Sequence, residues 1–434
     1  MQKLLLALVV FLQLLVSIPA EGAEPQIAVG LVTKQFTVEV SCKDGLSVSS
    51  TGNEVKEFSD EKIFVNAAQN SINFGAVRFA SGSVSIESKG DEPIVINRKA
   101  YRGSVRIELT ADKKDFNVVN ILPLEQYLYS VVGRSVPVIF PDEAIKAQAV
   151  AARSLAYSKL AQATGESYAV LAKDLLLTYT GVESEKKAIS RLVDATKGEM
   201  VVYNGVPIEA AFTVCTGGYT ENSEDIYGHY VPYLRSVKDY DADAPLASWE
   251  RSFDAKDVTA GLLRAGYDIG KLASIKLSAI DNLSSGDRTA VGRVLQIGFA
   301  GDKANVVLSG SAVKKIFALD SANFAVLVHR PIPSSLEISI ENQYGMEVGR
   351  KEVPIKINEK NADGSVITHV PDIHFVSGET GEKVTFKGRG SGEGLGLSLW
   401  GAKGMADQAP PRDKEYYQTI LSYYYSGTNI AELY

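Results

Sequence analysis

The stretch from Pro141 to Ala161 limits the possible folds of this chain more than any other, because it predicts a long helix that other elements surround closely. Proline stands at the first helical position, and Asp142 and Glu143 occupy the first turn, where the helix dipole favours acids. Six alanines lie between Ala144 and Ala156, and small side chains let a neighbouring element approach. One apolar stripe at helical spacing is formed by Ile145, Ala149, Ala152 and Ala156.

Three polar side chains interrupt this alanine-rich segment. Lys146 and Arg153 are seven residues apart and therefore share one face of the predicted helix, whereas Gln148 points elsewhere. A polar face on a packed helix is a candidate wall of a cleft.

The rest of the chain mixes strand and helix patterns. Short runs rich in Val, Ile and Thr recur from residue 26 to residue 122 between Gly, Asn, Asp and Ser clusters, which predicts an antiparallel β region. Residues 184–197 and 414–425 have helical patterns, and Asn204-Gly205 predicts a hairpin. We therefore expect an α+β fold with interleaved antiparallel β regions, a central alanine-rich helix and a Gly-rich C-terminal strand segment.

The first residues have the layout of a secretory signal peptide, with Lys3 ahead of an apolar run from Leu4 to Val16 and small residues between Ala20 and Ala23. We expect cleavage there and export to the cell wall, periplasm or exterior, with an uncleaved N-terminal anchor as the alternative. The predicted divisions are a signal peptide at 1–23, a β-rich region at 24–122, a core domain with the central helix at 123–250, an α/β insertion at 251–330 and a β-rich region at 331–434 that closes with an aromatic helix.

Charge and cysteine content narrow the possible partners. The formal net charge of −7 argues against a nucleic-acid partner and is compatible with a neutral glycan. Cys42 and Cys215 can pair in an exported chain or remain two buried free thiols. There is no Cys-x-x-Cys motif and no helical pairing of histidines, so we expect no metal site and no cofactor.

Residues 216–237 bring carboxylates, amides and tyrosines together after a Gly-Gly turn. Tyr219, Glu224 and Asp225 are the candidate ligand-binding residues, because carboxylates can bond sugar hydroxyls and aromatic faces can pack on sugar rings. The alternative is a capped turn, with Asn222 or Ser223 before the first turn of a short helix. Taken alone, the pattern favours the capped turn.

Glycine recurs at every second position from Gly388 to Gly396. In a strand this spacing leaves one face without side chains, so another backbone or a ligand can approach. The segment has neither the ending of a phosphate-binding loop nor the context of a dinucleotide site. The alternative is a strand that packs against another strand.

Several separate motifs occur in one order along the chain: Tyr101-Arg102-Gly103, VVNILPLEQYLYSVV at 118–132, PDEAIKAQAVAARSLA at 141–156, GGYTENSEDIYGHYVPYLRSV at 217–237, and the Gly-rich and aromatic segments near the end. In this arrangement the chain resembles the stage II sporulation protein D and amidase-enhancer family. The resemblance implies an exported protein that acts on bacterial peptidoglycan. Sporulation members are lytic transglycosylases that cut glycan strands stripped of stem peptides, alongside an amidase. The implied partners are therefore peptidoglycan glycan strands and a cell-wall amidase.

Two segments depart from the family pattern. The family's Val-Val-Ala/Pro-Ser-Glu-Met-Pro, whose glutamate is the catalytic acid and base, reads VVGRSVP here, so Ser135 occupies the position of the glutamate. In the Gly-rich motif, Glu393 replaces a histidine, and Leu397 and Leu399 replace methionine and glutamine. A serine hydroxyl is a poor general acid near neutral pH, and such acid–base help contributes a factor of about 10² to 10⁴.

Three hypotheses follow from these departures. In the first, the protein has weakened or no transglycosylase activity and binds glycan strands or enhances an amidase. The second is an active transglycosylase with a displaced acid, either Glu393 or Glu143. The third is an exported adhesion or structural protein that kept only the fold. For the first, the predicted substrate-binding residues are Ser135, Lys146, Gln148, Arg153, Tyr219, Glu224 and Asp225, with no confidently assigned catalytic residue.

Overall fold

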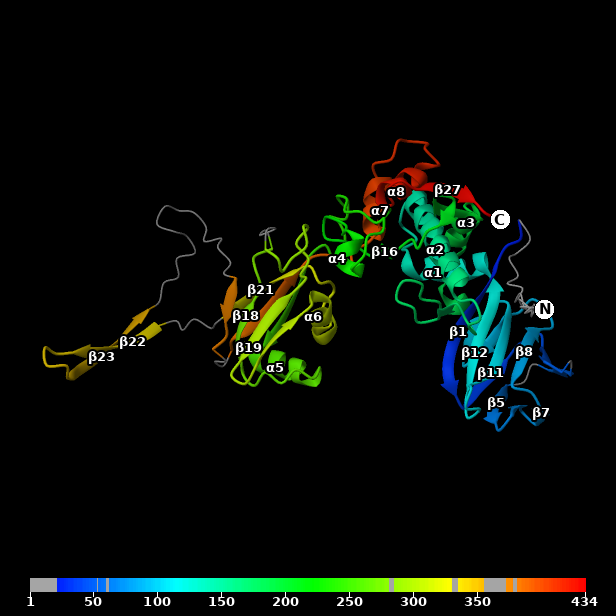
Figure 1. The fold of residues 1–434 in the computed structure, drawn as a ribbon, viewed down its shortest axis with the longest axis horizontal. Coiled ribbons are helices and arrows are strands. Elements are labelled where there is room, and N and C mark those ends of the chain that lie inside the picture. Colours follow the sequence, from blue (N-terminus) through cyan, green and yellow to red (C-terminus); the bar gives the residue numbers. More distant parts are fainter. Residues whose placement is uncertain are drawn as a thin grey trace, which may run out of the picture. The chain divides into compact units, whose positions relative to one another are not determined.

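The protein is described by a computed structural model that covers residues 22–52, 54–59, 62–280, 285–329, 335–354, 372–377 and 381–434. Almost all of the predicted signal peptide lies outside these residues. The chain forms two compact units, of which unit 1 combines Met1–Ala211 with Met405–Tyr434 and unit 2 is Phe212–Gly404 (Figure 1). Within the described ranges, no helix has the length and apolar character to cross a membrane. The finer divisions suggested at residues 122, 250 and 330 stay predictions.

Two sheets form the first part of unit 1, as the alternating runs predicted. Their strand orders are β13-β1-β12-β11-β8-β3-β4 and β10-β9-β2-β5-β6-β7, and the pairs are antiparallel except that β1 and β13 run parallel. The bounds are β1 Gln26–Gln35, β2 Thr37–Ser41, β3 Leu46–Ser50, β4 Val55–Phe58, β5 Ile63–Ala68, β6 Ser71–Phe74, β7 Val77–Phe79, β8 Ser83–Ser88, β9 Ile94–Ile96, β10 Lys99–Tyr101, β11 Ser104–Leu109, β12 Phe116–Pro123 and β13 Val170–Leu171.

Helix α2 lies at the centre of the helical part of unit 1. All its residues from Ala144 to Ala156 are buried except Lys146, which confirms the predicted packed central helix. The hairpin at Asn204-Gly205 is also confirmed, with both residues at positive φ of 51° and 78°. The remaining elements are α1 Leu124–Ser135, α2 Asp142–Gln162, the 3₁₀ helix η1 Gly181–Ser184, α3 Lys187–Asp194, β14 Glu199–Tyr203, β15 Val206–Pro207, α8 Tyr416–Tyr424 and β27 Asn429–Glu432, which pairs with β14.

Unit 2 contains a three-stranded sheet β17-β25-β21 and a four-stranded sheet β20-β19-β18-β24, which share an aromatic core around Phe324 and Phe386. Strands β22 and β23 form a separate hairpin. The bounds are β16 Phe212–Thr213, α4 Ser223–Tyr227, β17 Trp249–Asp254, α5 Ala255–Arg264, β18 Leu272–Lys276, β19 Ile297–Gly301, β20 Asn305–Leu308, α6 Gly310–Phe317, β21 Phe324–His329, β22 Ser335–Glu341, β23 Glu347–Pro354, β24 Ile373–Phe375, β25 Lys383–Gly388, β26 Leu397–Ser398 and α7 Leu399–Ala406.

The Gly-rich segment differs from its prediction. It is not a strand between the end of β25 and the start of β26, because the glycines at 390, 392, 394 and 396 have φ between 65° and 96°. Only glycine adopts this region at little cost. The expected close approach does occur, since a Cβ on Gly390 would lie 2.4 Å from the backbone oxygen of Thr216. Backbone conformation, as well as packing, therefore explains the repeat. The overall α+β class is confirmed.

Candidate functional site

Ser135 ends helix α1 at the position where the resemblance demands a glutamate. Its side chain is half-buried, and its Oγ donates to the backbone oxygen of Val132 at 3.3 Å. The chain then turns to extended backbone at Val136, whose N–H also bonds to Val132. Beyond it, Ile139 is 87% exposed while Phe140 is buried. The loop after α1 thus exposes an apolar tip, and the Ser135 hydroxyl donates a hydrogen bond to a backbone oxygen in the last turn of the helix.

The surroundings of this helix end carry several charged side chains. Lys186 donates from Nζ to the backbone oxygen of Val136 at 3.3 Å, and Arg134 is exposed. Glu185 runs close to the same helix, since its Cα lies 3.6 Å from the place of a Cβ on Gly133. Its carboxylate accepts three hydrogen bonds from the Arg102 guanidinium at 2.8 to 3.1 Å. This carboxylate is already engaged as an ion-pair partner.

Glu143 and Lys146, both predicted candidates, lie together at the start of α2. Lys146 Nζ donates to Glu143 Oε1 at 2.7 Å and to the backbone oxygen of Lys414 at 2.7 Å. The other Glu143 oxygen accepts from the backbone N–H of Tyr417 at 3.0 Å. Each side chain is 13% exposed. The pair holds the start of α8 against α2, which is a structural task.

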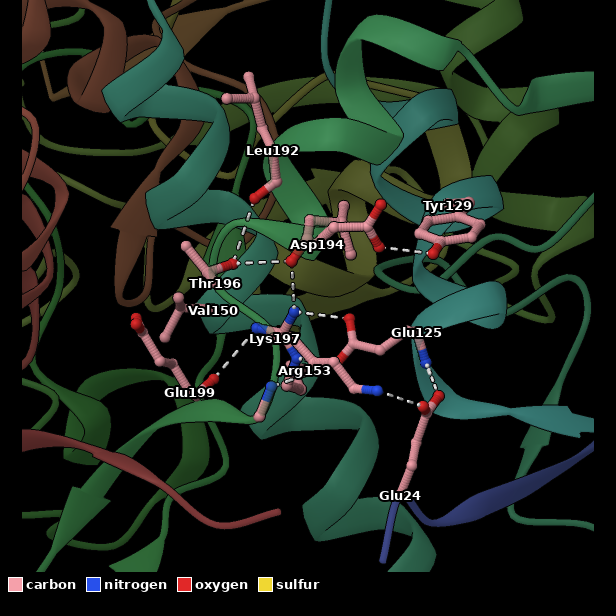
Figure 2. A network of polar contacts seen from close by, with 12 residues as sticks. Glu24, Glu125, Tyr129, Val150, Arg153, Leu192, Asp194, Thr196, Lys197 and Glu199 are labelled. Atoms are coloured by element: carbon pink, nitrogen blue, oxygen red, sulfur yellow. Dashed lines mark hydrogen bonds and ion pairs between the residues drawn. The ribbon is translucent and has the colours of Figure 1, made fainter.

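Arg153 occupies the centre of a buried polar network rather than a cleft wall (Figure 2). Its guanidinium donates to both carboxylate oxygens of Glu125, from Nε at 2.8 Å and from Nη2 at 2.7 Å. It also donates to the backbone oxygens of Val193 and Glu199, each at 3.1 Å. Glu125 accepts a further hydrogen bond from the hydroxyl of Tyr434 at 2.6 Å.

This network joins α1, α2, the end of α3, β14 and the C-terminal residue. The side chains of Arg153 and Glu125 are 0% and 4% exposed. Burial lowers the pKa of Arg153, but the hydrogen bonds and charge of Glu125 outweigh it, and the pKa is raised overall. Gln148 is also buried, at 1% exposed, so neither Arg153 nor Gln148 offers a surface to a glycan in this structure.

Tyr219, Glu224 and Asp225 lie in unit 2, around the short helix α4. Tyr219 is 52% exposed. The Arg235 guanidinium donates to both Glu224 oxygens at 2.5 and 3.0 Å, and these hydrogen bonds lower the pKa of Glu224 to about 2. The same guanidinium lies 4.3 Å from the ring centre of Tyr230. Glu224 and Asp225 stand in the first turn of α4, as the capped-turn alternative expected, although Asn222 makes no side-chain cap.

Glu393, the second candidate for a displaced acid, lies in the Gly-rich segment of unit 2. Its Oε1 accepts from Lys314 Nζ at 2.7 Å, and its side chain is 46% exposed. Cys42 and Cys215 are both buried free thiols, as the second of the two readings proposed. Among the described residues, no group of three or more His, Cys, Asp or Glu is placed to hold a metal ion.

The predicted residues are therefore distributed over both units. Ser135, Glu143, Lys146, Gln148 and Arg153 belong to unit 1, and Tyr219, Glu224, Asp225 and Glu393 belong to unit 2. Of the candidates, Glu143 and Lys146 form a direct ion pair. Sequence reasoning missed Glu125 and Tyr434. Glu125 carried a signal, because it is an acid two residues before the apolar YLYSVV run, whereas Tyr434 carried none.

Comparison with known proteins relates part of unit 1 to one protein family. Residues 112–203, which include α1, α2 and Ser135, match the family model described as SpoIID, stage II sporulation protein. A stage II sporulation protein D of Bacillus subtilis is 27% identical over 361 residues, which are 80% of this chain and 82% of the relative. An uncharacterized protein of Brachyspira hyodysenteriae is 26% identical over 317 residues, 73% of this chain and 68% of that one.

A third relative, an amidase enhancer of Bacillus subtilis, is 26% identical over 354 residues, which are 78% of this chain but only 45% of that protein. Residues 112–203 of this α+β chain, which contain the central helix α2, are thus similar to a stage II sporulation protein domain. More particularly, these matches confirm the resemblance to the stage II sporulation protein D and amidase-enhancer family.

Proposed function

We propose that this chain is an exported, peptidoglycan-associated protein that binds glycan strands or enhances a cell-wall amidase and has weakened or no transglycosylase activity. The single observation that carries the proposal is Ser135, whose hydroxyl bonds to the end of its own helix where the family has its catalytic glutamate. A transglycosylase must protonate the glycosidic oxygen, and a serine hydroxyl does so poorly near neutral pH.

The contacts of Glu143 and Glu393, the two candidates for a displaced acid, support the same proposal. Glu143 is held between Lys146 and the backbone of Tyr417, and Glu393 is paired with Lys314. Either carboxylate has to leave a lysine ammonium before it can donate a proton. A positioned general acid requires free reach to the leaving oxygen, so both are weak candidates for the displaced acid.

The activity half of the proposal is tested with peptide-free glycan strands and mass spectrometry of the products. We expect the wild-type protein and Ser135→Ala to release no anhydro-ended fragments above background, and Ser135→Glu to release them. Robust product formation by the wild type refutes the proposal. In that case Glu393→Gln and Glu143→Gln identify the acid, with melting curves to separate lost chemistry from the loosened α2–α8 contact of Glu143→Gln.

Binding to the cell wall and enhancement of an amidase are measured separately from transglycosylase activity. We expect the purified protein to sediment with sacculi and to raise the rate at which a cell-wall amidase releases stem peptides. Ser135→Ala serves as the matched control, because it should change neither result. A protein that neither sediments with sacculi nor affects the amidase is the adhesion or structural protein of the third hypothesis. Export rests on the apolar N-terminal run, and N-terminal sequencing of the mature protein tests cleavage between Ala20 and Ala23.

A further inference from the structure

A polar groove lies in unit 1 between helix α8 and strands β14 and β27. Its volume is about 370 Å³, and its walls carry the carboxylates of Glu199 and Glu432, the amides of Gln418 and Asn429, two hydroxyl side chains and one isoleucine. None of the site residues predicted from the sequence lines it. The groove is therefore separate from the Ser135 loop and needs its own explanation.

The two acidic residues of this groove occupy directly opposite positions of a strand pair. Glu199 of β14 is the direct antiparallel partner of Glu432 of β27. Side chains at directly opposite positions have Cβ atoms about 4.5–5.5 Å apart, and like charges there are destabilising. Among the described residues, neither carboxylate forms an ion pair. Like charges at opposite positions of a strand pair break a rule of sheet stability, and such breaks are expected at functional or strained sites.

Glu199 is held in a fixed orientation. Its Oε2 accepts from the hydroxyl of Tyr417 at 2.9 Å, and the Gln418 amide donates to the same hydroxyl at 3.3 Å. Burial raises the pKa of Tyr417 to about 12, so the phenol stays protonated and can keep donating to Glu199. One carboxylate oxygen is thus fixed by the protein, and the groove has a pre-positioned acceptor.

The composition of the walls selects the chemical class of the ligand. No lysine, arginine or histidine lines the groove, so it gives no charge to bind an anion. Metal ions such as Ca²⁺ take six to eight oxygen ligands, and among the described residues no group of three or more His, Cys, Asp or Glu is placed to hold a metal ion. Hydroxyl groups both donate and accept, which matches carboxylates beside amides and hydroxyls. The volume lies within the range of about 300–1,000 Å³ that ligand sites occupy.

We propose that this groove binds a sugar unit, with Glu199 and Glu432 accepting hydrogen bonds from neighbouring hydroxyls and the Gln418 and Asn429 amides donating to its oxygens. The identity of that sugar as part of a glycan strand rests on the proposed function. The groove would then be the glycan-binding site of unit 1, and the Ser135 loop would not be needed for binding.

The test measures binding of short, fluorescently labelled, peptide-free glycan strands to the full-length protein by anisotropy. Glu199→Gln and Glu432→Gln keep the side-chain shape and remove the charged acceptor, so each should weaken binding about tenfold or more. Gln418→Trp fills the groove and should abolish binding. Glu209→Gln, an exposed acid outside the groove, is the matched control and should leave the affinity unchanged. The melting temperature of Glu432→Gln should be equal or higher, because a like-charge contact is removed.

Three outcomes overturn the inference. Wild-type affinity in all three groove variants shows that glycan binds elsewhere, and the proposed function then survives without the groove. No binding of the strands by the wild type removes both the groove assignment and the glycan-binding function. Binding of calcium chloride that is lost in Glu199→Gln, with unchanged glycan binding, reassigns the groove to a cation.

Discussion

The buried pair of Arg153 and Glu125 gives the sharpest prediction about this protein. Changing Arg153 to methionine keeps much of the side-chain volume but leaves the Glu125 carboxylate 4% exposed and without its cation. It also removes four hydrogen bonds, two to Glu125 and two to backbone oxygens of Val193 and Glu199. Removing one partner of a buried ion pair costs about 3–5 kcal/mol.

We therefore expect Arg153→Met to lower the unfolding free energy of unit 1 by about 3–5 kcal/mol. For a unit of this size, each kcal/mol lowers the melting temperature by about 2–4 °C, so the total shift is roughly 6–20 °C. Arg153→Lys should be destabilising as well. The planar guanidinium bonds both carboxylate oxygens and two carbonyls, whereas an ammonium has only three donors and cannot replace all four hydrogen bonds. The double variant Glu125→Leu/Arg153→Met should be more stable than Arg153→Met alone, since no charge is left unpaired.

Unit 2 provides an internal control when the stability of unit 1 is measured. Both tryptophans, Trp249 and Trp400, lie in unit 2, so tryptophan fluorescence follows unit 2. Hydrogen exchange of peptides from α1 and α2 follows unit 1. We expect the fluorescence transition to stay in place while protection in unit 1 falls. A loss of unfolding free energy below about 1 kcal/mol in Arg153→Met refutes the structural role of Arg153. A lower glycan affinity in an Arg153 variant of unchanged stability refutes it as well and restores the predicted role in substrate binding.

Further predictions concern unit 2. Gly388→Ala should destabilise it by about 1–3 kcal/mol in urea denaturation, because the new Cβ would lie 2.1 Å from the Trp249 ring, whereas Gly298→Ala, with nothing closer than 3.5 Å, should be tolerated. Burial raises the pKa of Cys215 to about 12, so its thiol should resist alkylating reagents at pH 8 until urea unfolds the chain. Hydrogen bonds from the Arg235 guanidinium lower the pKa of Glu224 from 4.5 to about 2. The stabilisation from that pair is therefore complete above about pH 4.5 and lost as the pH falls through 2, which carboxyl-carbon NMR titration checks.

Several elements could be predicted from local sequence because their physical causes are local. Proline and two acids mark the start of α2, and its alanines allow the close packing that the structure shows. Asn204-Gly205 forms the expected turn because both residues tolerate positive φ. The serine at 135, where the family resemblance demands a glutamate, is also read from the sequence, and its chemical consequence stays a prediction.

The Gly-rich segment shows where local reasoning reaches its limit. A period of two fits a strand, but it fits equally a chain in which every second residue has positive φ. Sequence spacing does not distinguish these two conformations. The choice depends on neighbours such as Thr216, which come from distant parts of the chain.

By itself, the sequence determined the α+β class, the central helix and the hairpin, since each depends on residues close together in the chain. Only the tertiary structure decided that Arg153 is buried against Glu125 rather than exposed in a cleft. Only the tertiary structure placed Glu199 beside Glu432, because that contact arises from strand pairing between distant segments. Whether a charged side chain binds a ligand or supports the fold depends on which partner the fold brings to it.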